Sequence, residues 1–133
     1  QALILASTRE LAQSMHRVIS LLGDFMGARC HFCIGGTSLR EDILILERGV
    51  HVIVGTPGRL IGMMLKNLIK VNYTRLLFLD DADEMYCRGY KKQIKQIFAL
   101  LPGSIQCALF SSTMPSEILK SAAEFMRDPV RIH

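Results

Sequence analysis

Several features common in other classes of protein are missing from this sequence of 133 residues. No apolar run approaches the ~20 residues that a membrane-spanning helix requires, so we expect no membrane segment. No charged segment followed by an apolar one marks a signal peptide, and we therefore expect an intracellular protein. There is no linker, low-complexity tract or internal repeat, which favours a single domain. Because the first residue is Gln1 rather than Met, we expect a segment of a longer protein.

The sequence also lacks a convincing set of metal-binding cysteines. Cys30 and Cys33 have the C-x-x-C spacing of some zinc and redox sites, but no second C-x-x-C pair accompanies them. The pair lies in a strand-like run, where residues three apart point to opposite faces. We therefore expect buried, reduced thiols rather than a metal or redox site.

The composition is that of an ordinary globular protein, with half of the residues hydrophobic and 21% charged. The length is sufficient for one domain with a real core. The formal net charge is +4, which is compatible with an anionic partner.

Short apolar runs alternate with stretches of helical periodicity along the sequence. The apolar runs predict strands at residues 2–6, 30–34, 51–54, 76–79 and 107–110, with 130–132 as a candidate sixth strand. The periodic stretches, with their capping residues, predict helices at 7–23, 38–49, 56–66, 90–101 and 115–126. The strands are apolar throughout, so this alternation predicts one α/β domain with a parallel sheet and helices on both faces.

Polar residues and glycines follow every one of the five predicted strands. In chain order, these clusters are Ser7-Thr8-Arg9-Glu10, Gly35-Gly36, Gly55-Thr56-Pro57-Gly58-Arg59, Asp80-Asp81-Ala82-Asp83 and Ser111-Ser112-Thr113. In open parallel sheets, ligands bind at the carboxyl ends of the strands. We expect all five clusters to lie along one edge of the sheet.

The clusters suit phosphate chemistry. Glycines let backbone N–H groups approach a ligand, and helix N-termini favour anions. Arg9 and Arg59 add guanidinium groups to two predicted helix starts. An apolar strand that ends in Asp80 is the Walker B pattern, in which the carboxylate holds magnesium on a nucleotide.

Each cluster also has a purely structural interpretation. Ser7 with Glu10 has the spacing of a capping box, and Thr56 before Pro57 is a common helix start. The two adjacent glycines could form only a turn. The occurrence of all five clusters in this order favours the functional interpretation.

Taken together, the clusters resemble the first RecA-like domain of the DEAD-box RNA helicases. Residues 7–12 resemble motif Ia (Pro-Thr-Arg-Glu-Leu-Ala), 35–36 match the GG motif, 56–59 match motif Ib, 80–83 resemble motif II (Asp-Glu-Ala-Asp) and 111–113 resemble motif III (Ser-Ala-Thr). The resemblance covers essentially the whole chain. Flanking residues are most similar to the members that act in translation initiation. The resemblance implies a RecA-like sheet of the P-loop NTPase type, with residues 1–133 as a partial N-terminal domain.

The resemblance also implies ATP and Mg²⁺ as cofactors and RNA, single-stranded or duplex, as the partner. Asp80 would hold the magnesium, and Asp81 would activate the attacking water. Asp83 would link to Ser111 and Thr113 and so couple the ATP state to the RNA state. The residues that would hold the backbone of one RNA strand are Thr8, Arg9, Gly36, Thr56, Gly58 and Arg59. Backbone contacts position a strand without reading its sequence, so recognition would be sequence-independent.

Three residues depart from the motifs of the family. Ser7 replaces Pro, which should be mild because Ser caps helices well. Ser112 replaces Ala, and its hydroxyl needs a partner if it is buried. Asp81 replaces Glu, which withdraws the carboxylate by one methylene, about 1.5 Å. A misplacement of about 1 Å can cost roughly a hundredfold in rate, so hydrolysis could be slow or absent.

The sequence has no P-loop, because none of its ten glycines is followed by lysine. The adenine-reading Q motif and the second RecA-like domain of the family are absent as well. Without the P-loop strand, we expect exposed apolar surface. We also expect the 133 residues alone to bind Mg-ATP poorly and not to unwind RNA.

Two functional hypotheses stay open. In the first, the chain is part of an ATP-dependent RNA helicase of translation initiation, working with a second RecA-like domain and a scaffold protein. In the second, it is a catalytically impaired relative that binds RNA or a scaffold. An unrelated flavodoxin-like receiver domain also has acidic residues at the end of a strand, but that interpretation does not explain the five motifs in this order. We expect a cytoplasmic location, with a nuclear RNA role as the alternative, and no membrane partner.

Overall fold

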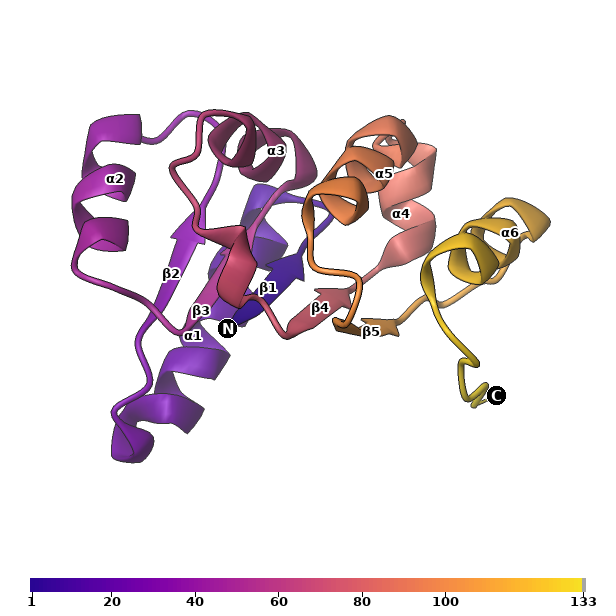
Figure 1. Ribbon diagram of the computed structural model, residues 1–133, viewed down its shortest axis with the longest axis horizontal. Coiled ribbons are helices and arrows are strands. Elements are labelled where there is room, and N and C mark those ends of the chain that lie inside the picture. Colours follow the sequence, from indigo (N-terminus) through magenta and orange to yellow (C-terminus); the bar gives the residue numbers. More distant parts are fainter. Residues whose placement is uncertain (133) are drawn as a thin grey trace.

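Five short strands form one parallel sheet in the computed structural model, which describes residues 1–132 (Figure 1). The strands are β1 (Ala2–Leu5), β2 (Cys30–Cys33), β3 (Val52–Gly55), β4 (Leu76–Leu79) and β5 (Gln106–Leu109). Their order in the sheet is β2-β3-β1-β4-β5, and every neighbouring pair is parallel. The predicted parallel α/β sheet is therefore confirmed, with β1 at its centre.

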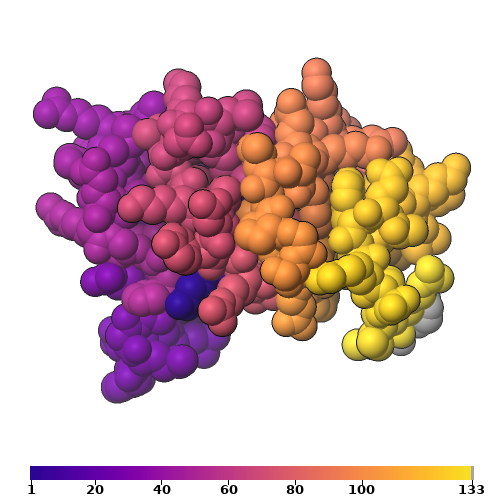
Figure 2. All heavy atoms as spheres, in the orientation of Figure 1, coloured from indigo at the N-terminus to yellow at the C-terminus, as the bar shows by residue number. Residues whose placement is uncertain are grey.

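Six helices connect and cover the strands. They are α1 (Arg9–Gly23), α2 (Leu39–Glu47), α3 (Pro57–Leu65), α4 (Ala82–Cys87), α5 (Lys91–Leu100) and α6 (Ser116–Phe125), with short 3₁₀ turns η1 (Asp24–Met26) and η2 (Val71–Tyr73). Figure 2 shows α6 and the last residues, in yellow, at one end of the molecule and the first half of the chain at the other. No helix within residues 1–132 is long and apolar enough to cross a membrane.

The two faces of the sheet carry separate apolar clusters. Leu3 and Leu5 belong to the larger cluster, which packs against α3 and α5, whereas Ile4 belongs to the smaller one, which packs against α1. This alternation follows from the two-residue period of a strand. Helices therefore cover both faces, as the uniformly apolar strands predicted.

Cys30 and Cys33 lie on opposite faces of the sheet, one in each cluster. Both are free thiols. Burial raises the pKa of the Cys30 thiol to about 11 and that of the Cys33 thiol to about 12. Thiols with such values stay protonated at neutral pH, as expected for the structural role predicted for this pair.

Two local predictions need correction, and one helix was not predicted. Residues 130–132 form no strand: Val130 and Ile132 are 87% and 91% exposed, and they pair with none of the described strands. The cap of α1 is Thr8 rather than Ser7, because the Thr8 hydroxyl accepts a hydrogen bond from the Leu11 N–H at 3.1 Å. Helix α4 is a separate element that was not among the predicted helices. Ser38, the first residue of the helix predicted at 38–49, caps α2, because its hydroxyl accepts a hydrogen bond from the Glu41 N–H.

Candidate functional site at the carboxyl edge of the sheet

The five polar clusters lie along one edge of the sheet, as predicted. All strands run in the same direction, so their carboxyl ends meet at that edge. Leu5 at the end of β1 is in register with Gly55 of β3 and with Leu79 of β4. The residues that follow these three positions are therefore neighbours in space.

A groove of about 570 Å³ opens along this edge. Its lining residues are Ser7, Thr8, Arg9, Glu10, Gly35, Thr56, Gly58, Arg59, Arg88 and Tyr90. Five of the six residues predicted to hold an RNA backbone are among them. Arg88 and Tyr90 were not among the predicted site residues, because they follow α4 rather than a strand, and no motif of the sequence analysis gave them a role.

Gly36, the sixth predicted residue, lies beneath the Arg9 side chain. Its φ of +89° is rarely adopted by other residues, and an added Cβ would come within 3.0 Å of Arg9 Nη1. The Arg9 side chain makes no hydrogen bond or ion pair with any residue in the part of the chain that the structure describes. The glycine therefore leaves room for an exposed guanidinium with no protein partner.

The start of α3 forms another part of the groove. Thr56 is the N-cap but accepts no hydrogen bond with its side chain, and Pro57 occupies the first turn, as predicted. No atom lies within 4 Å of the place where a Gly58 Cβ would be. The start of α3 is therefore open beside Gly58, and a helix N-terminus favours an anion there.

Arg59 is already engaged within the protein. Its Nη2 donates to Asp42 Oδ2 at 2.9 Å and to the Thr37 carbonyl at 3.1 Å, and its side chain is 16% exposed. These contacts tie α3 to α2 and to the loop after the two glycines. Arg59 therefore lies on the groove wall, and its guanidinium is bound by Asp42 and by the Thr37 carbonyl.

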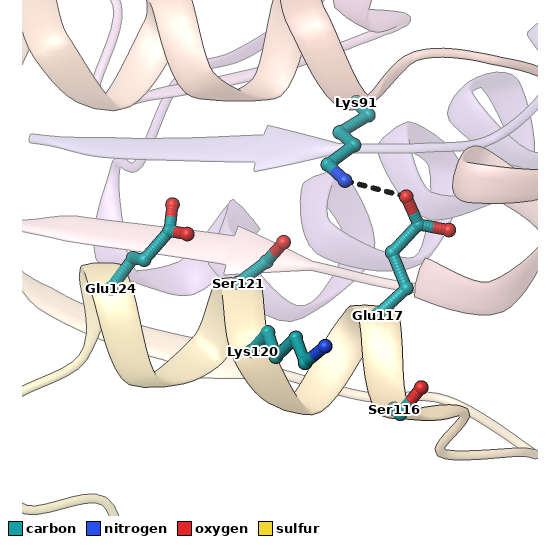
Figure 3. A pocket seen from close by; sticks show the side chains of 6 residues that line it. All are labelled: Lys91, Ser116, Glu117, Lys120, Ser121 and Glu124. Carbon is teal, nitrogen blue, oxygen red and sulfur yellow. Dashed lines mark hydrogen bonds and ion pairs between the residues drawn. The ribbon is translucent and has the colours of Figure 1, made fainter.

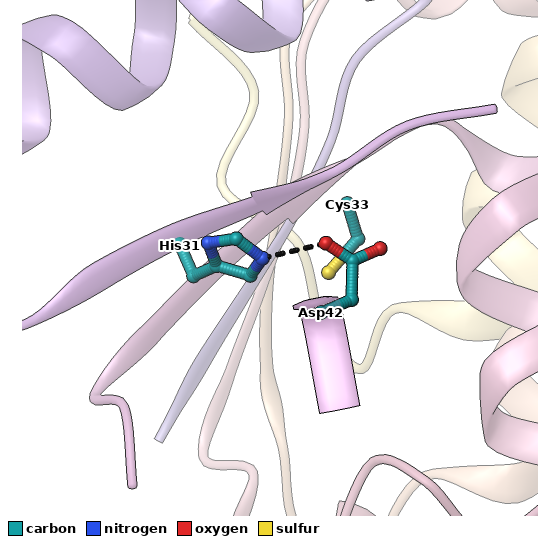
Figure 4. A group of neighbouring side chains, drawn as sticks. All are labelled: His31, Cys33 and Asp42. Carbon is teal, nitrogen blue, oxygen red and sulfur yellow. Dashed lines mark hydrogen bonds and ion pairs between the residues drawn. The ribbon is translucent and has the colours of Figure 1, made fainter. Parts of the chain in front are cut away.

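Asp42 also binds His31, whose Nε2 lies 2.8 Å from Asp42 Oδ1 (Figure 4). Three possible metal-ligand atoms, one each from His31, Cys33 and Asp42, lie within 4.8 Å of one another. Three protein ligands are enough for some zinc sites. However, Arg59 already compensates the Asp42 charge, and burial, followed by Asp42, raises the pKa of the Cys33 thiol to about 12. We therefore interpret this group as a buried hydrogen-bond network.

The four residues after β4 differ sharply in their contacts. The Asp80 carboxylate is half-buried and has no hydrogen bond or ion pair with any other residue of 1–132. A free carboxylate is a ligand that Mg²⁺ accepts, usually beside phosphates and waters, so this position fits the ion. Asp81 adopts a left-handed backbone, with φ of 60°, at the start of α4. Its Oδ2 accepts a hydrogen bond from Ser7 Oγ at 3.2 Å.

Asp83 is bound on several sides by the loop after β5. Its Oδ2 accepts hydrogen bonds from Thr113 Oγ1 and Ser112 Oγ, both at 2.7 Å, and from the Thr113 N–H at 2.9 Å. Its backbone N–H donates to Ser111 Oγ at 3.0 Å. The bonds from Thr113 and Ser112 hold the pKa of the Asp83 carboxyl well below its ordinary value. The extra hydroxyl of Ser112 thus has a partner.

A second hollow of about 300 Å³ lies between α5 and α6 (Figure 3). Lys91 pairs with Glu117 at 2.6 Å, and Lys95 pairs with Glu124 at 2.8 Å. Phe98 and Phe125 stack with their ring centroids 4.1 Å apart. These contacts attach α6 to the domain, and the hollow offers no free cluster of reactive groups.

Comparison with known sequences gives consistent matches. The model of the DEAD/DEAH box helicase family matches residues 1–121. Eukaryotic initiation factor 4A of Cryptosporidium parvum is 54% identical over 132 residues, which cover 99% of this chain and 33% of that relative. The ATP-dependent RNA helicase eIF4A of Phaeosphaeria nodorum is 52% identical with the same coverage. The chain therefore spans about a third of the length of these curated relatives.

Two solved structures share the fold. A DEAD box protein from the hyperthermophile Methanococcus jannaschii superposes with a TM-score of 0.93 at 32% identity, over 96% of this chain and 35% of that one. The yeast DEAD-box splicing factor Prp28 gives a TM-score of 0.90 at 31% identity, over 95% and 30%. The predicted RecA-like sheet flanked by helices is confirmed.

Proposed function

Since the chain belongs to the DEAD/DEAH box helicase family, we propose that it is part of the first RecA-like domain of an ATP-dependent RNA helicase. The observation that carries this proposal is the groove. It brings Thr8, Arg9, Thr56 and Gly58 together beside the carboxylates after β4. A surface that would bind phosphate thus lies next to a carboxylate that would hold a metal ion, on one edge of the sheet.

The groove would hold the backbone of one RNA strand. The starts of α1 and α3 present N–H groups, and Arg9 supplies an unpaired guanidinium for a phosphate. These groups recognise phosphate rather than base edges, so binding would be independent of sequence and would weaken steeply with added salt. Arg59 would act through the network with Asp42, which fixes the wall of the groove.

The acidic residues would serve ATP hydrolysis. Mg²⁺ bound to ATP neutralises phosphate charge, and Asp80 is the residue of this chain that would hold it. Asp81, at the start of α4, would orient water. Asp83 joins α4 to the loop at 111–113, so a shift in one would be transmitted to the other. This sequence contains no P-loop motif, and we propose that another part of the protein binds the phosphates of ATP.

The names of the relatives support a role in translation initiation. We propose in addition a cytoplasmic location, with a nuclear role as the alternative, and a second RecA-like domain and a scaffold protein as partners. The alternative is a relative that has lost hydrolysis and only binds RNA or the scaffold. The specific observation in its favour is Asp81, whose side chain is shorter than the Glu of the family motif and bonds to Ser7.

The test is RNA-stimulated phosphate release by the full-length protein, measured beside its Asp81→Glu variant. Release by both proteins supports the helicase. If only the variant is active, by roughly a hundredfold over the parent, the site has become a binding site. If neither releases phosphate but both bind single-stranded RNA, the binding-module function holds, and absence of RNA binding contradicts both functions.

A further inference from the structure

We propose that Ser7 is a positioning residue that holds the Asp81 carboxylate and connects it directly to the RNA groove. This inference rests on the proposed function of the site. It assigns a role to Ser7 and Asp81, two of the three residues at which this chain departs from the family motifs, and it adds a connection separate from the one through Asp83.

The contact follows from the register of the central strands. Leu5 of β1 lies beside Leu79 of β4, and Ser7 and Asp81 each lie two residues further on. The side chains therefore meet although they are separated by 74 residues in the sequence, with Ser7 Oγ 3.2 Å from Asp81 Oδ2. A proline at position 7 would offer no hydroxyl, so this bond requires the serine.

Ser7 is placed to fix the carboxylate rather than to bind solvent or cap a helix. Its residue is 2% exposed, and Thr8 rather than Ser7 caps α1. Asp81 has no other side-chain hydrogen bond or ion pair within residues 1–132. A shorter acid has fewer rotatable bonds than Glu, so a single donor suffices to restrict it.

The same residue adjoins the groove. Ser7 lines it and is followed immediately by Thr8 and Arg9, two residues proposed to contact the RNA backbone. A strand that binds to these residues shifts or stiffens the loop that carries the Ser7 hydroxyl. The effect reaches Asp81 across one hydrogen bond, without passing through the loop at 111–113.

The experiment uses the full-length protein without nucleotide and measures hydrogen exchange of the amides of residues 80–85 by mass spectrometry. Four proteins are compared: the parent, Ser7→Ala, Ser7→Thr and the control Ser121→Ala. Ser121 is buried to the same degree as Ser7 but lies on α6 and makes no side-chain hydrogen bond to a described residue. Each protein is measured with and without single-stranded oligouridylate.

We expect Ser7→Ala to speed exchange roughly fivefold, as the loss of one hydrogen bond would, and Ser7→Thr and Ser121→Ala to match the parent. Adding RNA should change exchange at 80–85 in the parent but not in Ser7→Ala. Where the parent hydrolyses ATP, Ser7→Ala should lower kcat with the KM for RNA unchanged.

Unaltered exchange in Ser7→Ala without RNA would overturn the positioning role. Altered exchange with the RNA response preserved would overturn the connection to the groove, as would an effect confined to the KM for RNA. A parent protein that neither binds RNA nor releases phosphate would refute the proposed function and the connection to the groove. The positioning role would still be decided in that case, because hydrogen exchange measured without RNA requires neither a ligand nor activity.

Discussion

The groove side and the acidic side of the site are built in the same way, although their charges are opposite. On the groove side, Arg59 is bound by Asp42 and by the Thr37 carbonyl, whereas Arg9 has no partner among residues 1–132. On the acidic side, Asp83 is bound by the loop at 111–113, whereas Asp80 has none in that range. Each side thus holds one charge for structure and leaves another for a ligand. Substituting a held residue should therefore lower the stability of the fold, whereas substituting a free residue should lower binding or activity and leave the stability unchanged.

The largest effect is expected where the held charge on the groove side loses its partner. Asp42→Ala leaves the mostly buried Arg59 guanidinium and His31 without their carboxylate. Removing one member of a buried pair typically costs about 3–5 kcal/mol, so the free energy of unfolding in urea should fall by that amount. Glu47 is an exposed acid of the same helix whose side chain makes no ion pair within residues 1–132, so Glu47→Ala should change the free energy of unfolding by less than about 0.5 kcal/mol. A small loss in Asp42→Ala would mean that Arg59 is not held as the structure indicates.

Asp80→Asn tests the free charge on the acidic side and should have the opposite profile. Because the carboxylate makes no hydrogen bond or ion pair within residues 1–132, unfolding in urea should be unchanged. RNA-stimulated phosphate release by the full-length protein should fall by about 100- to 1,000-fold, as when a key electrostatic group is lost. Retention of the parental rate would show that Asp80 does not serve the reaction.

Gly36→Ala tests the free charge on the groove side indirectly. The new methyl group crowds Arg9 Nη1 and forces alanine into a left-handed conformation that costs about 1–2 kcal/mol. We expect the affinity for single-stranded RNA, measured by fluorescence anisotropy, to fall roughly tenfold, which corresponds to about 1.4 kcal/mol. Gly103→Ala is the matched control, because Gly103 has a normal φ and open space around its Cβ position. If the two variants bind RNA with equal affinity, Gly36 does not contribute to the RNA-binding site.

The order of elements and their shared edge were predictable from the sequence because they depend on local patterns. Runs such as residues 76–79 are apolar throughout, and polar clusters follow them, so a parallel sheet brings the clusters together whatever the details of packing. The same reasoning failed at residues 130–132, where Val130 and Ile132 alternate with Arg131 but are exposed and pair with no described strand. A short alternating stretch becomes a strand only where it pairs with a neighbouring strand.

The contacts that distinguish held from free charges were not predictable. Asp42 gave no signal in the sequence beyond being a polar residue of a helix, and its pairing with His31 and Arg59 depends on how α2 and α3 pack. Ser7 matched a capping box, yet its hydroxyl bonds to Asp81 and the cap moved to Thr8. Local spacing names the candidates for a hydrogen bond, and tertiary structure chooses among them.

The smallest expected effect concerns the held charge on the acidic side. Thr113→Val removes the hydroxyl that contributes most to lowering the pKa of Asp83, while Ser112 and the Thr113 N–H remain. The pKa of Asp83 should therefore rise toward its ordinary value without reaching it. A carboxyl with a lowered pKa stabilises the fold at pH above its unfolded value, and this stabilisation is lost as the pH falls through the folded value.

In the variant, the stabilisation at pH 7 should be smaller than in the parent. Its loss should begin near the unfolded pKa in both proteins and should be complete at a higher pH in the variant. Carboxyl ¹³C NMR and acid unfolding followed by circular dichroism measure the two quantities. Thr74→Val is the control, since Thr74 makes no side-chain hydrogen bond to residues 1–132. If the Asp83 pKa stays as low as in the parent, the Ser112 hydroxyl and the Thr113 N–H suffice to hold it, and the added hydroxyl at position 112 has taken over the role of Thr113.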